Sequence, residues 1–302
     1  MKKYYVLINK LAGKDSGNSA KLAIEEQIKD GEIQFIDIAQ IKDYKDFFKG
    51  IDSGDAVVLC GGDGTLNRFV NDTDVADIKC EILYYPAGSG NDFYKDVAGT
   101  DEKKIIAIGE YIKDLPEVFV KGETYKFLNN VGYGIDGYCC EEGDRLRELG
   151  KKNISYTSIA IKGVLGKYKL KDAEVEVDGQ TYKFKKVLIA PTMNGKYYGG
   201  GMMPAPNQDR KNKDGIVSLM VMHGCCRLKG LMIFPSIFTG KHVKHEKYVK
   251  IIEGHNVTVR FSKPSALQID GETILGVTEY KVVSKCRNAE KVVAEEVAIT
   301  EA

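Results

Sequence analysis

The strongest constraint on the fold is an uninterrupted apolar segment that runs directly into a glycine-rich turn. Residues 56–60 (AVVLC) form a continuous apolar run, which is typical of a strand buried on both faces of a parallel sheet. A helical stretch follows after the run Gly61-Gly62-Asp63-Gly64-Thr65. Glycines at a strand end let backbone N–H groups face an anion, and the next helix adds its N-terminal dipole. The segment predicts a phosphate-binding loop in an α/β sheet, and a plain turn is the alternative.

A second glycine loop follows the next predicted strand, residues 81–85. Its sequence is Pro86-Ala87-Gly88-Ser89-Gly90-Asn91-Asp92-Phe93. A lone Gly-Ser-Gly sequence indicates only a turn. Parallel strands that point the same way end at the same edge of their sheet, so we expect the two loops to lie together. The pair therefore supports phosphate binding more strongly than either loop alone.

The N-terminal part of the chain alternates between strand and helix patterns. We expect strands over residues 4–8 and 33–38, and helices over residues 19–29 and 41–48. In residues 19–29, the apolar side chains recur at the spacing of one helical face. Strands that alternate with helices predict right-handed βαβ units and an α/β layer fold.

The remainder of the chain is dominated by strand patterns. Strict alternation of apolar and polar residues, as in 257–261, is typical of antiparallel strands with one solvated face. We expect helices near residues 137–149 and 154–168, and strands over residues 125–131, 173–177, 182–190, 215–222, 248–252, 257–261, 266–269 and 280–283. The change of pattern predicts an α/β domain over residues 1–122 and a β-rich sandwich domain over residues 123–285. Residues 289–299 fit either a helix or a strand.

Composition excludes some classes of protein. The chain has 44 Lys and Arg against 43 Asp and Glu, and a net charge of +1. Non-specific nucleic-acid binding needs an excess of cations, so we expect no nucleic-acid partner. The most apolar stretch, residues 228–239, is too short to span a bilayer, and the N-terminus lacks a secretory pattern. Seven cysteines without a zinc-binding spacing favour a reduced, cytoplasmic location.

A third motif lies near the end of the β-rich region, at residues 268–272 (QIDGE). The pair Asp270-Gly271 is a hairpin turn signal, and a turn alone explains it. The functional interpretation adds a carboxylate at the mouth of a cleft. Such a group accepts a proton from an attacking hydroxyl during phosphoryl transfer.

Together these motifs resemble the diacylglycerol kinase catalytic-domain family, which includes bacterial soluble diacylglycerol kinases and the sphingosine and ceramide kinases. The resemblance covers nearly the whole chain and keeps the order of six segments, residues 61–67, 88–93, 130–136, 198–205, 214–215 and 270–272. It implies a parallel-sheet domain like that of NAD kinase, followed by a β-sandwich domain that binds the substrate. It also implies that residues 286–302 return to pack on the first domain.

The resemblance implies a lipid kinase that uses ATP and Mg²⁺ to phosphorylate diacylglycerol or a similar lipid alcohol. Glu272 matches the family's general base, and Asp214 matches an acid of a structural magnesium network. Asp63 is implied in catalysis around the nucleotide. The implied nucleotide-binding residues are Asn9, Gly61, Gly62, Asp63, Gly64, Thr65, Gly88, Ser89, Gly90, Asn91 and Asp92. Phosphoryl transfer suits such a set, because it needs positioning and charge neutralisation rather than a protein nucleophile.

Four positions depart from the family pattern: Lys10, Arg68, Phe119 and Thr273. Many members carry an acid near the acceptor at the position of Phe119. Two alternatives to a lipid kinase therefore stay open. An NAD kinase-like enzyme shares the loop at residues 61–65, and a lipid- or nucleotide-binding regulator without turnover would account for Phe119. Glu272 and the two intact glycine loops favour the kinase.

Lysine-rich segments and an aromatic cluster bear on the acceptor. Two groups of lysines fit either a solvated basic face or a contact with anionic headgroups. They are Lys162, Lys167, Lys169 and Lys171, and Lys241, Lys244, Lys247 and Lys250. The residues Tyr197-Tyr198 and Met202-Met203 fit either a lipid entrance or core packing. The expected partners are ATP and a lipid substrate at the inner membrane surface, which the protein visits transiently, and the family resemblance also allows a homodimer.

Overall fold

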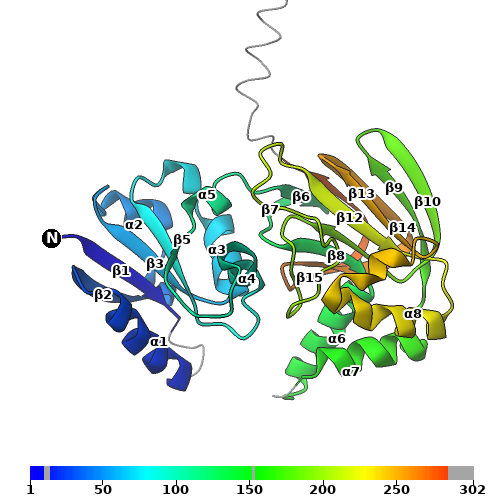
Figure 1. Ribbon diagram of the computed structural model, residues 1–302, viewed down its shortest axis with the longest axis horizontal. Coiled ribbons are helices and arrows are strands. Elements are labelled where there is room, and N and C mark those ends of the chain that lie inside the picture. The colour runs from blue at the N-terminus through cyan, green and yellow to red at the C-terminus, as the bar shows by residue number, and fades with distance from the viewer. Residues whose placement is uncertain (10–13, 152–153, 285–302) are drawn as a thin grey trace, which may run out of the picture. The chain divides into compact units, whose positions relative to one another are not determined.

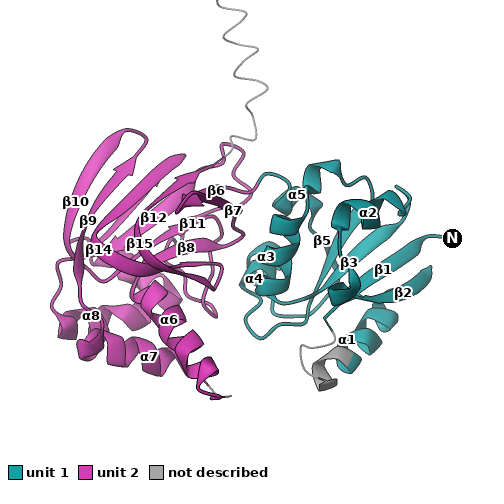
Figure 2. Ribbon diagram, turned by 180° about the vertical axis from the view of Figure 1, so that it is seen from behind, with its two compact units in different colours: residues 1–114 teal, residues 115–302 magenta. Residues whose placement is uncertain are grey.

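The computed structural model describes residues 1–9, 14–151 and 154–284. The chain separates into two compact units, Met1–Asp114 (unit 1) and Leu115–Ala302 (unit 2), which Figure 2 shows in different colours. Unit 1 has an α/β architecture with a mostly parallel sheet, and unit 2 is an antiparallel β sandwich with helices. The predicted fold class is therefore confirmed. The predicted packing of residues 286–302 lies outside the described residues.

Unit 1 is built on a five-stranded sheet with the order β2-β1-β3-β4-β5. Four parallel strands are β1 (Lys3–Ile8), β2 (Glu32–Asp37), β3 (Ala56–Gly61) and β4 (Glu81–Pro86). The short strand β5 (Ile106–Ala107) runs antiparallel to β4. The connecting helices are α1 (Lys14–Gln27), α2 (Tyr44–Lys49), α3 (Asp63–Asp72), α4 (Asp92–Ala98) and α5 (Gly109–Ile112), with 3-10 turns η1 (Ile38–Gln40) and η2 (Val75–Asp77).

Strand β3 is buried along its whole length at the centre of this sheet, as its uninterrupted apolar run predicts. The register aligns Ile8 of β1 with Cys60, and Gly61 with Pro86 of β4. The segments that follow β1, β3 and β4 therefore leave the sheet at one edge. The predicted neighbourhood of the two glycine loops follows from this register.

Unit 2 is built on ten strands in one hydrogen-bonded sheet that folds over to enclose its core. The strands are β6 (Glu117–Val120), β7 (Glu123–Lys126), β8 (Asn130–Gly134), β9 (Lys171–Val177), β10 (Gln180–Val187), β11 (Ile189–Met193), β12 (Val217–Met222), β13 (Val249–Gly254), β14 (Asn256–Ile269) and β15 (Glu272–Val283). Figure 1 shows three helices gathered beside the strands, α6 (Ile135–Glu148), α7 (Tyr156–Lys162) and α8 (Arg227–Ile233). Short helical segments are η3 (Gly163–Lys167), which is π-helical, η4 (Phe234–Thr239) and η5 (Lys241–Lys244).

The long strand β14 joins the two layers of the sandwich. Its first half pairs with β9 and its second half with β8, while β15 pairs along nearly all of it. The register shifts between Arg260 and Ser265, and such an irregularity bends a strand. Fully buried side chains that include Tyr133, Val259 and Tyr280 fill the space so enclosed. Among the described residues, no helix is long and apolar enough to cross a membrane.

Several element predictions in unit 2 are wrong. The predicted strand 182–190 is divided at Leu188 between β10 and β11. The predicted strand 125–131 is broken between β7 and β8, because the backbone N–H groups there bond to the Asp270 side chain instead of a neighbouring strand. The predicted strands 257–261 and 266–269 are one bent strand, β14. The predicted helix 154–168 changes from α7 to the π-helical segment η3 after Lys162.

Candidate functional site

The two glycine loops of unit 1 are in direct contact. A β-carbon added to Gly88 would lie 2.5 Å from the Cα of Gly62, and one added to Gly61 would lie 2.5 Å from the Thr65 side chain. No larger residue fits at Gly61 or Gly88 without a shift of the neighbouring atoms. Packing between and within the loops therefore explains glycine at these positions, independently of any ligand.

Gly64 differs from the other glycines of this loop. It is exposed in the first turn of α3, and a β-carbon added to it would meet no atom within 4 Å. Glycine within a helix costs up to about 1 kcal/mol relative to alanine. Neither packing nor backbone conformation gives a reason for glycine here. A ligand that approaches the backbone closely is the explanation that fits.

Asp63 ties the two loops together. Its carboxylate accepts hydrogen bonds from the backbone N–H groups of Asp92 (3.0 Å) and Phe93 (2.9 Å), at the start of α4. Asn91 adopts a left-handed conformation with φ of 51°, and its side chain bonds to Gly88 N–H (3.1 Å) and to Gly88 O (2.8 Å). Asp63 thus positions the second loop, in addition to the catalytic role that the resemblance implies. Sequence reasoning missed this link, because its partners lie about thirty residues further along the chain.

The other predicted nucleotide-binding residues lie at the same edge of the sheet. Asn9 directly follows β1, and residues 10–13 beyond it are outside the described residues. Thr65 lies in the first turn of α3, and Ser89 and Gly90 lie exposed between β4 and α4. The structure therefore brings the predicted set together at one edge of unit 1.

In unit 2, the Asp270-Gly271 turn is both a hairpin and an anchor. Both residues have positive φ, 46° and 95°, which a two-residue hairpin of this kind needs. The Asp270 carboxylate also accepts hydrogen bonds from the backbone N–H groups of Leu128, Asn129 (2.8 Å) and Asn130 (3.0 Å). The turn therefore holds the segment that leads into β8.

Glu272 is the first residue of β15 and pairs with Ile269 across the hairpin. Its side chain is exposed. The hydroxyl of the next residue, Thr273, donates a hydrogen bond to Asp144 of α6 (2.6 Å). The backbone at Glu272 is therefore fixed by the hydrogen bonds of the Asp270 carboxylate and by the bond from Thr273 to α6. An accessible carboxylate on a fixed backbone is suited to accept a proton.

A buried carboxyl contacts β14 just before the Asp270-Gly271 turn. Asp136, in the first turn of α6, accepts a hydrogen bond from the Gln268 side chain (3.0 Å). Burial raises the pKa of Asp136 to about 6, against the opposite effect of this hydrogen bond. The Tyr198 hydroxyl and the Asn130 amide nitrogen also act on this carboxyl, yet neither has a hydrogen bond of ordinary geometry within the described residues. A buried acid with a shifted pKa beside unsatisfied polar groups is a functional-site candidate.

Asp136→Asn is expected to stabilise the protein in a pH-dependent manner. Between pH 3.8 and about 6 the unfolded chain has released this proton and the folded chain retains it, so the contribution of Asp136 to stability falls as pH rises. Above this window the charged group costs about 3 kcal/mol, at 1.36 kcal/mol per pKa unit. Urea unfolding should therefore show a gain of up to about 3 kcal/mol near pH 8 and little gain near pH 4. An equal gain at both pH values would show that the pKa is not raised.

A polar network that sequence reasoning missed supports the same segment from a second side. Buried Arg210 donates hydrogen bonds to Leu128 O (2.9 Å) and to the Asn129 side chain (2.7 Å). The Asn194 side chain also donates to Leu128 O (2.9 Å), and Gln208 donates to Asn194 O (3.2 Å). The only signal in the sequence is that two polar residues, 208 and 210, follow an apolar run at 202–205.

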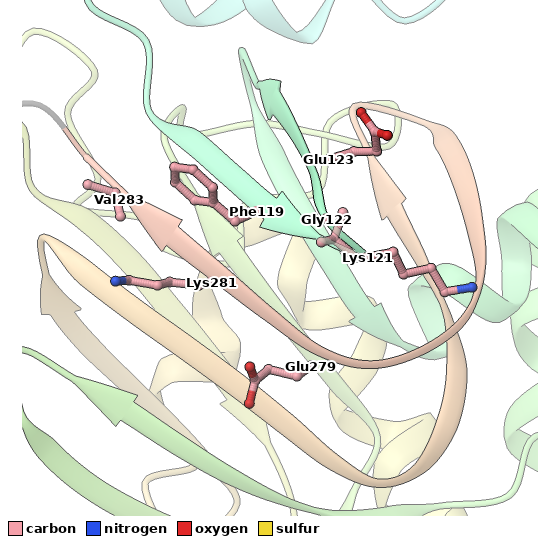
Figure 3. A pocket seen from close by; sticks show the side chains of 8 residues that line it. Phe119, Lys121, Gly122, Glu123, Glu279, Lys281 and Val283 are labelled. Carbon is pink, nitrogen blue, oxygen red and sulfur yellow. The ribbon is translucent and has the colours of Figure 1, made fainter.

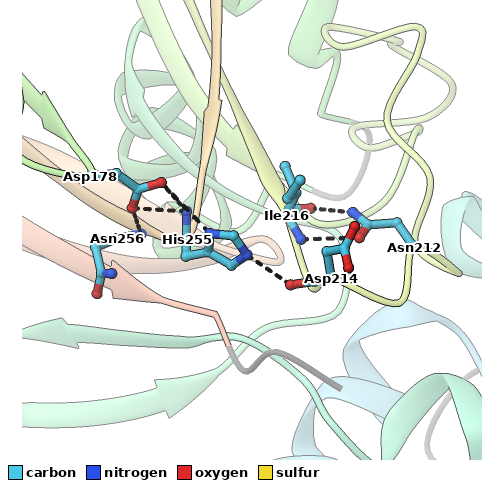
Figure 4. A network of polar contacts seen from close by, with 6 residues as sticks. All are labelled: Asp178, Asn212, Asp214, Ile216, His255 and Asn256. Atoms are coloured by element: carbon cyan, nitrogen blue, oxygen red, sulfur yellow. Dashed lines mark hydrogen bonds and ion pairs between the residues drawn. The ribbon is translucent and has the colours of Figure 1, made fainter. Parts of the chain in front are cut away.

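Asp214 belongs to a separate polar network, shown in Figure 4. The His255 ring bonds to the backbone oxygen of Asp214 (2.8 Å), and the exposed Asp214 carboxylate takes no part in that bond. Asp178 accepts hydrogen bonds from the backbone N–H groups of His255 (3.1 Å) and Asn256 (2.8 Å). Within residues 1–9, 14–151 and 154–284, no three His, Cys, Asp or Glu side chains assemble into a metal site. Asp214 as a magnesium ligand therefore stays a prediction.

A surface pocket of about 450 Å³ lies between the β6–β7 hairpin and β15 (Figure 3). Phe119, which is 40% exposed, lines it together with both acidic and basic side chains. The charged lining residues are Lys121, Glu123, Glu279 and Lys281. Glu272 is not among the lining residues. The departure from the family pattern at Phe119 therefore falls in this pocket.

The chain resembles known proteins along both units. The diacylglycerol kinase catalytic domain matches residues 3–123, and the YegS C-terminal NAD kinase beta sandwich-like domain matches residues 129–287. A diacylglycerol kinase of Mycobacterium tuberculosis is 27% identical over 198 residues, 63% of this chain and 62% of the relative. A diacylglycerol kinase of Bacillus subtilis is 24% identical over 229 residues, 72% of this chain and 71% of the relative.

A solved structure shares the fold. The crystal structure of a diacylglycerol kinase from Bacillus anthracis superposes with a TM-score of 0.59 and covers 94% of each chain, at 17% sequence identity. At that identity the likeness concerns the fold alone. The first matched domain contains the two glycine loops, and the second contains the Asp270 turn. The chain therefore belongs to the diacylglycerol kinase catalytic-domain family, in the form that carries a YegS-type C-terminal β sandwich.

Proposed function

We propose that this protein is a lipid kinase that transfers the γ-phosphate of ATP to the hydroxyl of diacylglycerol or a similar lipid alcohol. The observation that carries the proposal is the pair of contacting glycine loops at the carboxyl edge of the parallel sheet, with Gly64 open beside them. That edge is where open α/β sheets bind phosphates. Relatives named diacylglycerol kinases support the acceptor.

In the proposed reaction, the acceptor oxygen forms a bond to the γ-phosphorus of ATP. The bond from that phosphorus to the bridging oxygen breaks, and ADP leaves. Glu272 takes the proton of the acceptor hydroxyl. Charge neutralisation at the phosphates would be supplied by Mg²⁺ bound together with ATP. Because the hydroxyl proton leaves late in a loose transition state, a carboxylate can serve as the proton acceptor.

Buried Asp136 and the groups around it are the proposed binding site for the polar end of the acceptor. The Tyr198 hydroxyl and the Asn130 amide nitrogen act on the Asp136 carboxyl without hydrogen bonds of ordinary geometry in the described residues, so their hydrogen-bonding capacity is incompletely used. A lipid alcohol or ester oxygen would supply further partners. This role would explain why the chain keeps a cluster that lowers its stability. The cluster includes Gln268, which lies two residues before the Asp270-Gly271 turn of the Glu272 hairpin.

Gly64→Ala is expected to weaken ATP binding and leave the fold intact. The added methyl group meets no protein atom, but it would occupy space beside the phosphates. A conflict of about 1.4 kcal/mol lowers affinity roughly ten-fold. Gly88→Ala is the contrasting variant, because its β-carbon collides with Gly62 and should lower Tm. Titration calorimetry with ATP and thermal unfolding check both, and wild-type ATP affinity in Gly64→Ala would place the phosphates elsewhere.

The proposed activity is tested by following labelled γ-phosphate from Mg·ATP in mixed micelles. The acceptors are diacylglycerol, monoacylglycerol, ceramide, sphingosine and undecaprenol, with NAD as a soluble control. Label in a lipid supports the kinase and names its acceptor. Label in NAD alone would refute the lipid assignment in favour of an NAD kinase-like enzyme. ATP binding without label in any acceptor would favour a regulator.

A further inference from the structure

Exposed apolar side chains gather on one part of unit 2. Of the eleven large apolar side chains that are exposed in the described residues, seven lie on helices α6, α7 and α8 or on the turns that follow them. They are Leu149, Tyr156, Ile161, Leu165, Leu228, Met232 and Phe238, with exposed fractions of 40% to 69%. Single exposed apolar residues need no explanation, whereas a cluster marks an interaction surface.

The segments that carry this cluster are neighbours. The Arg227 side chain of α8 donates a hydrogen bond to Val164 O of η3 (2.8 Å), which fastens the two segments together. Figures 1 and 2 show α7 and α8 side by side from opposite directions. Buried Val164 and Ile233 belong to one apolar cluster with strands β11 to β13. The inward faces of these segments are therefore committed to the core of unit 2.

The outward faces carry the exposed residues in pairs. Leu228 and Met232 are four residues apart on α8, so they occupy one side of that helix. Ile161 lies near the end of α7, and Leu165 lies in η3, which directly follows α7. Phe238 follows on η4. We refer to these five side chains as the apolar face. Nothing in the core requires them to be large and apolar.

Positive charge predominates in the two chain segments that carry the apolar face. Residues 154–170 contain three lysines and no acid, and residues 223–247 contain five Lys and Arg and one acid. These two segments carry a net charge of +7 in a chain whose total is +1, so the rest of the chain carries −6. Lys162, Lys167, Lys169, Lys241 and Lys244 are exposed. The basic residues are thus concentrated where the apolar side chains are.

We propose that the apolar face docks on an anionic lipid bilayer. Apolar side chains on short helices enter the boundary between headgroups and acyl chains, and lysines around them contact anionic headgroups. The purpose of such docking rests on the proposed function, since the acceptor resides in a bilayer, but the evidence for the surface does not. Charge favours a bilayer over a second copy of this chain, because a two-fold contact would bring together the +7 net charge that these two segments carry in each copy.

The test is co-sedimentation of the protein with vesicles in the absence of ATP. The vesicles are phosphatidylcholine alone and phosphatidylcholine mixed with phosphatidylglycerol. Wild-type protein should prefer the anionic vesicles and lose affinity with added salt. The double variant Leu165→Gln, Leu228→Gln should bind them at least about ten-fold more weakly, and Lys162→Gln, Lys167→Gln roughly five-fold more weakly for each lysine. Leu22→Gln on α1, where the side chain is 63% exposed, is the matched control and should bind normally.

Two further readouts separate this inference from the proposed function. Unchanged vesicle binding by the Leu165→Gln, Leu228→Gln variant would overturn the docking surface, even if lipid phosphorylation is confirmed. If the wild-type protein forms dimers that this variant abolishes, and does not bind vesicles, the apolar face is a contact between two copies of this chain. On a short-chain, monomeric diacylglycerol the variant should retain the wild-type rate, and on vesicles it should lose it. If the protein binds vesicles through this face but phosphorylates no lipid, the docking surface is supported and the proposed kinase activity is refuted.

Discussion

Glu272→Gln is expected to lower kcat for lipid phosphorylation by roughly 10²- to 10⁴-fold, the usual contribution of a positioned general base. The amide has nearly the same shape as the carboxylate but cannot take the proton of the acceptor hydroxyl. Because Glu272 is exposed on a hairpin end, the substitution should leave Tm and ATP affinity unchanged. Initial rates with saturating Mg·ATP and diacylglycerol micelles measure the effect.

Glu279→Gln is the control for the Glu272 experiment. Glu279 lies on the same strand and is also exposed, and its partner is Arg260. An exposed ion pair of this kind contributes little, so activity should fall by less than about two-fold. Wild-type kcat in Glu272→Gln would show that another group accepts the proton. Glu123, the other acid of the Phe119 pocket, would then be the next candidate.

Asp270→Ala is expected to lower the free energy of unfolding by about 3 to 5 kcal/mol. The substitution removes the acceptor for three backbone N–H groups at residues 128–130. It also places alanine at φ of 46°, a conformation that costs about 1 kcal/mol for a residue with a β-carbon. Urea unfolding of wild-type and variant protein measures the loss.

Asp270→Gly separates these two causes. Glycine adopts positive φ without strain, so its loss of stability reports the missing hydrogen bonds alone. Asp270→Asn keeps one acceptor oxygen and tolerates this conformation, so it should be the least destabilising of the three. Equal stability of the glycine variant and the wild type would show that the three bonds contribute nothing net. The segment 128–130 would then owe its position to Arg210 and Asn194.

The elements that could be predicted are those whose signals are local. The apolar run of β3 and the glycine loops after β3 and β4 predicted a common sheet edge, because parallel register forces those loops together. The Asp270-Gly271 hairpin was likewise predicted from two residues. Glu272 directly follows that turn in the sequence. The catalytic role that the family resemblance implies for Glu272 stays a prediction.

The parts that could not be predicted depend on contacts between distant residues. The Asp270 carboxylate accepts hydrogen bonds from donors about 140 residues away, and these bonds interrupt the strand that was predicted over 125–131. Asp136 meets Gln268 from 132 residues away, so its burial and raised pKa are invisible in its local sequence. Packing alone explains Gly61 and Gly88, whereas an added β-carbon would meet no atom within 4 Å at Gly64 and only ordinary van der Waals contacts at Gly90.

The most direct test of the lipid kinase assignment is the stoichiometry of the reaction. Purified wild-type protein is mixed with Mg·ATP and diacylglycerol in phosphatidylglycerol-containing vesicles, and phosphorus NMR follows ADP and phosphorylated lipid in the same sample. The account predicts that the two products appear at equal rates and that both vanish in Glu272→Gln. ADP that forms without phosphorylated lipid, or at a rate independent of diacylglycerol, would contradict it.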